Sequence, residues 1–276
     1  MILPGRNGMD TDWLFFGETL LREAAERELA GEVPGGSVRI KSDGSYVTDS
    51  DIRIETLLRR RLRARFPDHG IRGEEQSSIN EKAAFQWMID PIDGTHSFVH
   101  KIPLYGMLLA LSHEDCPVMG WIFLPALNLM ISGAKGTGLR VNGRPRPAAR
   151  KDARDPAREI IATGERHQFE AAGLDALWVD LARRTRHLRT YCDCFGHAMT
   201  VLGATGVMVD VHLKVWDWQA TTVLMREAGG VLLRADSADS GTSDLLFGKP
   251  DVIDVLIRTW DKEGISHPWT DCTETA

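Results

Sequence analysis

The most informative segment of the chain reads Trp87-Met88-Ile89-Asp90-Pro91-Ile92-Asp93-Gly94-Thr95. Two carboxylates stand three residues apart directly after an apolar run, and a glycine and a threonine follow them. This order predicts a strand that ends in a tight turn and opens a helix. Hard divalent cations prefer carboxylate oxygens, and phosphates bind the free backbone N–H groups at the start of a helix. The segment therefore predicts metal-assisted phosphoryl chemistry.

Length and charge narrow the classes of protein. The chain has 276 residues, of which 43% are hydrophobic, enough for a large core in one or two domains. Its net charge of −6 offers no broad basic field, so we expect no nucleic-acid partner. The basic run at residues 59–65 follows apolar residues at helical spacing, which predicts a solvated helix face.

Cysteine usage and hydropathy favour a cytoplasmic protein. The four cysteines include Cys192 and Cys194 but no second pair at the spacing of zinc ligands. The N-terminus lacks the basic segment and long apolar run of a signal peptide. No apolar stretch reaches the roughly 18 residues of a membrane span. We therefore expect a soluble protein with no membrane partner.

The first half of the chain reads as helices followed by strands. Helical spacing of apolar residues predicts a helix over residues 12–29 and a second helix that Thr48 or Asp49 caps and that ends at residue 66. The glycine-rich residues 31–44 predict a mobile loop or a loose hairpin. Strands are predicted over residues 70–73, 85–89, 107–113, 118–123 and 129–133.

A polar, proline-containing stretch at residues 145–156 predicts a domain boundary. We expect an N-terminal α+β metal-binding domain over residues 1–148 and a C-terminal α/β substrate domain over residues 149–276. In the second domain, strands are predicted over residues 159–163, 187–190, 206–211 and 231–234. Helices are predicted over residues 171–184, 196–202, 216–228 and 250–260.

Acidic residues stand at the ends of several predicted elements: Asp51, Glu74, Asp90 with Asp93, and Asp217. Each has a structural alternative, since Asp51 could complement a helix dipole, Glu74 could lie on the surface and Asp217 could cap a helix. Asp90 is the hardest to explain structurally. It follows an apolar run, so it should end a buried strand, where an unpaired charge is costly and a bound cation would remove that cost.

These acidic motifs occur together in the order of a known family, and the chain resembles the inositol monophosphatase family from about residue 12 to residue 260. The segment from Asp90 to Thr95, followed by Ser97-Phe98-Val99-His100-Lys101-Ile102-Pro103, is similar to the first signature of that family. Trp216-Asp217 with Glu227-Ala228-Gly229-Gly230 is similar to its second signature. Its remaining acidic motifs resemble Val47-Thr48-x-x-Asp51 and Gly73-Glu74-Glu75, with Lys41 upstream.

The resemblance implies a fold and a role for each matching residue. The fold would be the layered αβαβα arrangement, α+β and α/β in its parts, of the inositol-monophosphatase-like sugar phosphatases. Two or three Mg²⁺ ions, with Mn²⁺ as an alternative, would be held by Glu74, Asp90, Asp93, Asp217 and the backbone carbonyl of Ile92. Asp51 and Thr95 would hold and activate the attacking water, with Glu74 as a further catalytic residue. The N–H groups of Gly94 and Thr95 would hold the phosphate.

The chemistry of these residue types agrees with that assignment. Mg²⁺ is bound by carboxylates together with water and substrate phosphate oxygens, and it lowers the pKa of a bound water. Phosphoryl transfer requires positioning and electrostatic stabilisation more than covalent chemistry. The sequence therefore predicts a metal-dependent phosphoric monoester hydrolase acting on a small phosphorylated metabolite. A non-catalytic binding protein on the same fold is disfavoured because every expected ligand is present.

The substrate is predicted from the second half of the chain. Asp193-Cys194-Phe195-Gly196-His197 and the later Val209-Asp210 resemble the histidinol-phosphatase branch of the family. Cys192 and the run Phe98-Val99-His100-Lys101 depart from that branch. We therefore expect a histidinol-phosphate-like substrate, with inositol-1-phosphate or an aminocyclitol, sugar or nucleoside phosphate as alternatives.

Four residues are candidates for contact with the substrate. Asp193 could pair with an ammonium or imidazolium, or could instead cap the helix that begins near residue 195. Asp210 could accept a proton from a hydroxyl or amine, His197 follows the substrate segment, and Lys41 could close over the metals. The family is commonly dimeric, which predicts a homodimer.

Overall fold

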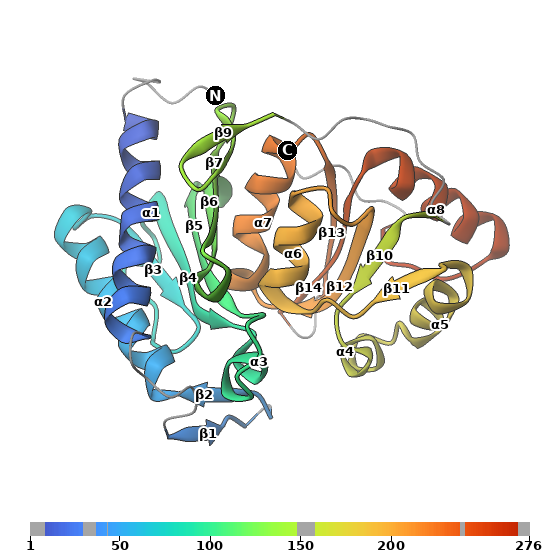
Figure 1. Cartoon of the computed structure of the whole chain (residues 1–276), viewed down its shortest axis with the longest axis horizontal. Helices are drawn as coiled ribbons and strands as arrows, with labels where there is room; N and C mark the ends of the chain where they lie inside the picture. The colour runs from blue at the N-terminus through green and yellow to red at the C-terminus, as the bar shows by residue number, and fades with distance from the viewer. Residues whose placement is uncertain (1–8, 30–36, 43, 148–157, 238–240, 270–276) are drawn as a thin grey trace.

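The computed structural model describes residues 9–29, 37–42, 44–147, 158–237 and 241–269, and its elements stack in five layers (Figure 1). Helices α1 (Met9–Glu28) and α2 (Asp49–Arg65) pack against each other and against one face of the first sheet. Helices α6 (Asp193–Val201) and α7 (Val215–Glu227) lie between the two sheets. Helices α4 (Arg166–Ala171), α5 (Asp175–Arg184) and α8 (Pro250–Glu263) cover the far side. This confirms the predicted αβαβα layering.

The first sheet has seven strands in the order β3-β4-β5-β6-β7-β8-β9. Strands β3 and β4 are parallel, and every other neighbouring pair is antiparallel. A separate hairpin, β1 (Val38–Ile40) and β2 (Tyr46–Thr48), precedes α2. The strands of the sheet are β3 (Gly70–Gly73), β4 (Phe85–Asp93), β5 (Gly106–His113), β6 (Cys116–Leu124), β7 (Leu129–Ala134), β8 (Gly138–Val141) and β9 (Arg144–Arg146).

The second sheet has five strands in the order β11-β10-β12-β14-β13. Strands β11, β10 and β12 are parallel, and β14 is antiparallel to both of its neighbours. Two short helices, α3 (Thr95–Val99) and the 3-10 helix η1 (Pro125–Leu127), complete the fold. The strands are β10 (Ile160–Thr163), β11 (His187–Arg189), β12 (Val207–Leu213), β13 (Val231–Asp236) and β14 (Ser243–Gly248).

Two predictions for these elements are corrected, and several elements were missed. The helix expected over residues 171–184 begins only at Asp175, as α5, and Gly173, with a φ of +71°, separates it from the preceding α4, which was not predicted. Strands β8, β9 and β14 were not predicted. Arg59, placed on a solvated face by the sequence, is buried with 5% exposure. Most of the predicted boundary at residues 145–156 lies outside the described residues, so the division at residue 148 stays a prediction.

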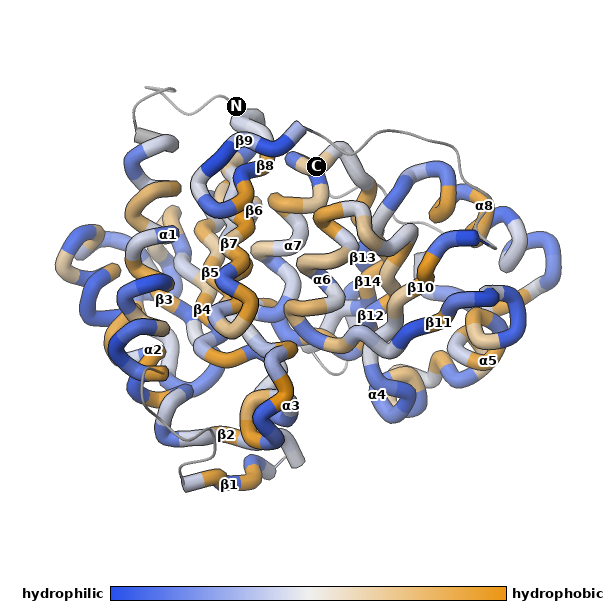
Figure 2. The backbone as a smooth tube through the Cα atoms, in the orientation of Figure 1, coloured by the Kyte–Doolittle hydropathy of each residue, from blue (hydrophilic) through white to orange (hydrophobic). Residues whose placement is uncertain are grey.

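The core is continuous across the two halves of the chain. Hydrophobic residues concentrate in the strands and in α6 and α7 (Figure 2). One cluster joins Leu108 and Ile122 of the first sheet to Ala198, Trp218 and Leu224 of the middle helices. Helix α7 is thereby fixed against the first sheet. Within the described parts of the chain, no helix is long and apolar enough to cross a membrane.

Candidate active site

The turn after β4 has the shape that the sequence predicts. The strand register shifts between Asp90 and Asp93, and Gly94 caps α3 with a φ of +84°. A side chain at Gly94 would be strained by this φ and crowded, because a Cβ there would lie 3.0 Å from the carbonyl oxygen of Leu104. The hydroxyl of Thr95 donates a hydrogen bond of 2.9 Å to the carbonyl of Ile92. Asp90, Ile92, Asp93, Gly94 and Thr95, a part of the expected metal, phosphate and water residues, therefore share one compact turn.

Buried and partly buried carboxylates from β4, from α7 and from the segment after β3 meet near this turn. Burial raises the pKa of Asp90 well above its usual range, and repulsion from Glu74, Asp93 and Asp217 raises it further. The pKa values of Asp93 and Asp217 are raised in the same way, by burial first and by neighbouring carboxylates second. Burial raises the pKa of Glu74 to about 7. The structure thus brings the predicted ligands into one electrostatic field.

Asp51 keeps one carboxylate oxygen unused. Thr48 is the N-cap of α2, and Oδ2 of Asp51 accepts a 2.8 Å hydrogen bond from its backbone N–H and another from its hydroxyl. Oδ1 of Asp51 is buried and has no hydrogen-bond partner among the described residues. Burial raises the pKa of Asp51 to about 6. Helix capping explains the position of Oδ2, and Oδ1 can accept a proton or bind a ligand.

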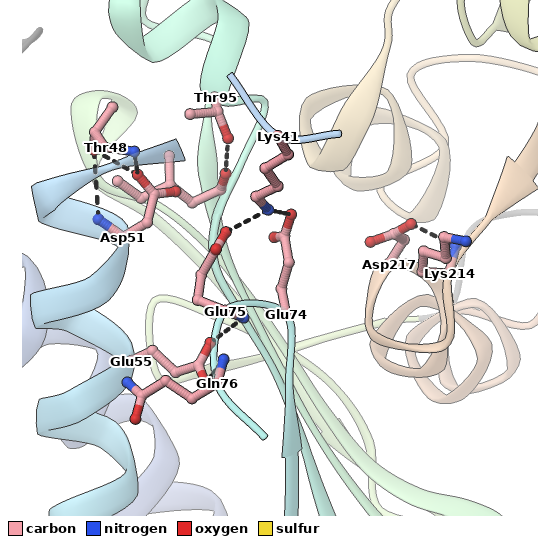
Figure 3. A network of polar contacts seen from close by, with 11 residues as sticks. Lys41, Thr48, Asp51, Glu55, Glu74, Glu75, Gln76, Thr95, Lys214 and Asp217 are labelled. Carbon is pink, nitrogen blue, oxygen red and sulfur yellow. Dashed lines mark hydrogen bonds and ion pairs between the residues drawn. The ribbon is translucent and has the colours of Figure 1, made fainter. Parts of the chain in front are cut away.

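Lys41 reaches the site from the β1–β2 hairpin. Its Nζ lies 2.6 Å from Oε1 of Glu74 and 2.6 Å from Oε1 of Glu75 (Figure 3). These two carboxylates raise the pKa of Lys41, so the side chain stays charged. The predicted role of Lys41 beside the substrate therefore starts from an ion pair with a predicted metal ligand.

Asp217 faces the same region from the second half of the chain (Figure 3). It is the third residue of α7, and its Oδ2 accepts a 2.7 Å hydrogen bond from the backbone N–H of Lys214. The N-cap residue is Lys214, so the interpretation of Asp217 as an N-cap is corrected. Asp217 caps the helix from its first turn and still contributes its charge to the site.

The residues fit Mg²⁺ in their donor chemistry. Oδ1 of Asp90 and Oδ1 of Asp51 are buried without hydrogen-bond partners among the described residues, which is costly for oxygens of acidic groups. Oxygen ligands of this kind suit a hard divalent cation. Across the described ranges, no three acidic, histidine or cysteine side chains already converge on a single point, so the ligands would have to draw together around an ion.

Two more carboxylates lie on the α6 side of the turn. Oδ2 of Asp193 is 3.1 Å from the position a Cβ would take at Gly94, so this carboxylate borders the phosphate turn directly. Burial and the charges of Asp210 and Glu165 raise the pKa of Asp193 to about 7. Asp193 is the first residue of α6 and Cys192 is its N-cap, so the capping alternative for Asp193 is not realised. Oδ1 of Asp210 is buried and unpartnered within the described chain.

His197 lies deeper than the sequence suggested. It is 1% exposed, and its ring nitrogens contact Thr221 Oγ1 at 2.7 Å and Asp210 Oδ2 at 3.0 Å. With both nitrogens occupied, His197 cannot contact a substrate directly. In this structure the His197 ring contacts Asp210, a second residue predicted to contact the substrate.

Comparisons with known proteins place the chain in a family. The sequence profile of the inositol monophosphatase family matches residues 10–260. The chain belongs to the inositol monophosphatase family. Its relatives in this family include histidinol-phosphatases and inositol-1-monophosphatases, and the chain is a phosphoric monoester hydrolase. Members of the family generally depend on Mg²⁺.

Two relatives and one solved structure show which members of the inositol monophosphatase family the chain is similar to. A histidinol-phosphatase of Chlorobaculum parvum is 34% identical over 69% of this chain and 73% of its own length. A histidinol-phosphatase of Mycobacterium tuberculosis is 30% identical over 71% of this chain and 76% of its own. The structure of an IMPase from Thermotoga maritima is 26% identical, with a TM-score of 0.78, over 92% of this chain and 100% of its own.

Proposed function

We propose that the protein hydrolyses a small phosphomonoester whose alcohol part is positively charged, as in histidinol phosphate, in a Mg²⁺-dependent reaction. The observation that carries the proposal is the placement of Asp193 directly beside the phosphate turn at Gly94. A substrate held by its phosphate at this turn would bring its alcohol part next to that carboxylate.

The reaction that we propose uses the residues of the turn and of α2. Bound Mg²⁺, in two or three ions with Mn²⁺ as an alternative, would neutralise phosphate charge and lower the pKa of the attacking water. The N–H groups of Gly94 and Thr95 would bind phosphate oxygens. Oδ1 of Asp51 and the hydroxyl of Thr95 would orient the water, and a pKa of about 6 suits Asp51 to accept its proton near neutral pH. The ions would be held by Glu74, Asp90, Ile92, Asp93 and Asp217.

Charge favours a cationic substrate over a neutral one. Asp193 and Asp210 raise the pKa of the neighbouring Cys192 thiol, after its burial, and Glu165 adds to this effect. An ammonium or imidazolium would offset these charges, and a pair between ionised groups is stronger than a neutral hydrogen bond. A neutral polyol would leave Asp193 without a cationic partner. The two histidinol-phosphatase relatives support the same choice.

Inositol-1-phosphate remains the alternative, with aminocyclitol, sugar and nucleoside phosphates behind it. The run Phe98-Val99-His100-Lys101 favours it, since this run is more like the inositol enzymes, and Cys192 departs from the histidinol-phosphatase pattern. A non-catalytic binding role is a weaker alternative, which phosphate release with Mg²⁺ and its loss with EDTA would exclude.

A substrate panel tests the proposal. We expect kcat/KM for histidinol phosphate to exceed that for inositol-1-phosphate, fructose-1,6-bisphosphate and nucleoside monophosphates by at least about tenfold. Asp193→Asn should lower kcat/KM for histidinol phosphate by about 10- to 100-fold, because it removes one member of a charge pair. It should change kcat/KM by less than about threefold for phosphomonoesters whose alcohol part is neutral. A preference for inositol-1-phosphate, or an equal loss on all substrates, would overturn the proposal.

The location is inferred from cysteine usage and hydropathy, and the assembly is inferred from the family resemblance. We propose a cytoplasmic homodimer whose ligand is a small phosphorylated metabolite. Trp121 and Phe123, two large apolar side chains of β6, are buried at 0% and 4% exposure within the core. An interface would therefore have to use other residues, and light scattering of the purified protein would measure the subunit number.

A further inference from the structure

A buried ion pair on α2 stands beside the segment that carries Glu74. Glu55 is 0% exposed and Arg59 is 5% exposed, and Arg59 Nε donates a 2.7 Å hydrogen bond to Glu55 Oε1. The two residues are four positions apart in the helix, so their side chains lie on one face. Neither residue belongs to the family motifs discussed above. Burying two charges is expensive unless further hydrogen bonds satisfy them, which raises the question of what they hold.

Both members of the pair bind the backbone of residues 75–77. Glu55 Oε2 accepts a 2.8 Å hydrogen bond from the N–H of Glu75, and Oε1 accepts one of 3.1 Å from the N–H of Gln76. Arg59 donates from Nη2 to the carbonyl of Gln76 at 2.7 Å and from Nη1 to the carbonyl of Ser77 at 2.9 Å. The carboxylate of Glu55 thus accepts from the N–H groups of this segment, and the guanidinium of Arg59 donates to its carbonyl groups.

Gly73 shows how closely the pair approaches. A Cβ on Gly73 would lie 2.5 Å from Oε1 of Glu55, a distance that real Cβ atoms do not reach. The glycine of the Gly73-Glu74-Glu75 motif is therefore explained by the carboxylate of Glu55 and not by an unusual backbone angle. Glu74 thus has fixed backbone on both sides: the glycine before it packs on Glu55, and the N–H after it is hydrogen-bonded to Glu55 (Figure 3).

We propose that Glu55 and Arg59 are positioning residues that fix residues 74–77 so that Glu74 is presented to Mg²⁺. The proposal rests on the proposed function, in which Glu74 is a metal ligand. Mg²⁺ demands a near-ideal octahedral arrangement of its ligands. A ligand on a segment without strands or helices meets that demand only if its backbone is held, and residues behind the ligands commonly set metal affinity.

The contact with Lys41 makes this support necessary. The ammonium of Lys41 attracts both Glu74 and Glu75, each at 2.6 Å. The N–H of Glu74 donates a 3.2 Å hydrogen bond to the carbonyl of Ile89, which anchors the start of the segment to β4. The hydrogen bonds from Glu55 and Arg59 extend this anchoring over residues 75–77, against the attraction of Lys41. The buried pair keeps the backbone attached to α2, the helix that also carries Asp51. Glu74 and Asp51 are thereby held in one frame.

Isothermal titration of the full-length protein with Mg²⁺, without substrate, tests the inference. In Glu55→Gln the amide can accept hydrogen bonds through only one atom, so we expect the Kd for Mg²⁺ to rise by about 10- to 100-fold. Excess Mg²⁺ should restore most of the kcat, since no group that touches the substrate is changed. Arg59→Lys keeps the charge but loses the two-carbonyl contact, and we expect a smaller rise in Kd, of about three- to tenfold.

Glu159→Gln is the matched control. Glu159 is also buried, at 5% exposure, and is paired with Lys249 at 2.9 Å, but it precedes β10 while the substrate residues lie beyond the other end of that strand. Its variant should lose stability without a change in the Kd for Mg²⁺. Arg59→Lys is measured in the same way if Glu55→Gln does not fold.

The outcomes separate this inference from the proposed function. An unchanged Kd in folded Glu55→Gln, or in Arg59→Lys if only that variant folds, would overturn the positioning role, as would an equal change in Glu159→Gln. An unmodified protein that does not bind Mg²⁺ at all would overturn the proposed function instead.

Discussion

The Nζ atom of Lys41 lies 2.6 Å from Oε1 of Glu74, so a lysine and a predicted metal ligand share one ion pair. Both side chains are partly accessible, at 22% and 19% exposure. The ammonium offsets part of the repulsion among the buried carboxylates of the site. A divalent cation would do the same, so Lys41 and Mg²⁺ act on the same charge.

Replacement of Lys41 by glutamine tests that competition. Without the ammonium, Mg²⁺ no longer competes with Lys41 for Glu74, and the site carries one positive charge less. We expect Mg²⁺ to bind about three- to tenfold more tightly, which corresponds to roughly 0.6–1.4 kcal/mol for a solvent-screened pair. Titration calorimetry would measure this change. Lys135→Gln, on an exposed turn, removes the same charge elsewhere and should leave the Kd unchanged. Weaker binding in Lys41→Gln would show that Lys41 organises the ligands.

Asp93→Asn tests the metal assignment at its centre. The amide keeps the shape of the side chain but removes its charge, and Mg²⁺ strongly prefers carboxylate. We expect kcat/KM to fall by at least about a hundredfold at a fixed Mg²⁺ concentration, as after loss of one stabilising group at a reaction centre. Asp115→Asn, on the exposed turn between β5 and β6, should retain full activity. A fully active Asp93→Asn enzyme would exclude Asp93 as a metal ligand.

The sequence predicted the parts of the site that are local in the chain. Asp90, Asp93 and Gly94 belong to one turn, so their spacing alone placed them together. Contacts between distant segments were not predictable in this way: Asp193 reaches Gly94 only because α6 packs between the sheets. Arg59 was misplaced for a related reason. A run of arginines normally marks a solvated face, and only the backbone at residues 75–77 turns this one inward.

The missed strands have a similar physical explanation. Strands β8 and β9 are only four and three residues long and continue a sheet that earlier strands establish. Strand β14 contains few β-branched residues, and it is held by antiparallel neighbours on both sides. Helical and strand propensities are weak priors that tertiary packing overrides. The longer strands β4 to β7 carried a clear pattern and were predicted correctly.

Gly94→Ala separates backbone strain from crowding at the phosphate turn. A φ of +84° costs a residue with a side chain about 1–2 kcal/mol. The added methyl would also press on the carbonyl of Leu104 and the carboxylate of Asp193. Gly136→Ala has a comparable φ of +79° and open space around the Cβ. Denaturant unfolding should show similar losses of stability from strain in both variants. Only Gly94→Ala should lose kcat/KM, by at least about tenfold.

If both alanine variants kept wild-type kcat/KM, the turn would not bind the phosphate. If both lost it equally, general instability would explain the loss. Inorganic phosphate, used as a competitive inhibitor, gives a second measurement. Its inhibition constant should rise in Gly94→Ala and stay constant in Gly136→Ala.

The raised carboxylate pKa values predict how stability depends on pH. The pKa is about 6 for Asp51 and about 7 for Glu74, each above its ordinary value near 4. Between about pH 4 and about pH 7 the folded, metal-free protein therefore binds more protons than the unfolded chain. Its free energy of unfolding should fall as the pH rises through this window, because the buried groups must ionise. Thermal denaturation in EDTA would show a falling Tm.

Magnesium should reverse this trend, because it binds the ionised carboxylates and releases their protons. The gain in Tm from Mg²⁺ should therefore be small near pH 5, where the carboxyl groups with raised pKa values are protonated. It should be large near pH 8, where these groups are ionised. Asp51→Asn removes one of the titrating groups, so its metal-free Tm should depend less steeply on pH around its pKa of about 6. A Tm that rises with pH in EDTA would show that these carboxylates are stabilised by ionisation and would contradict their placement in a buried acidic site.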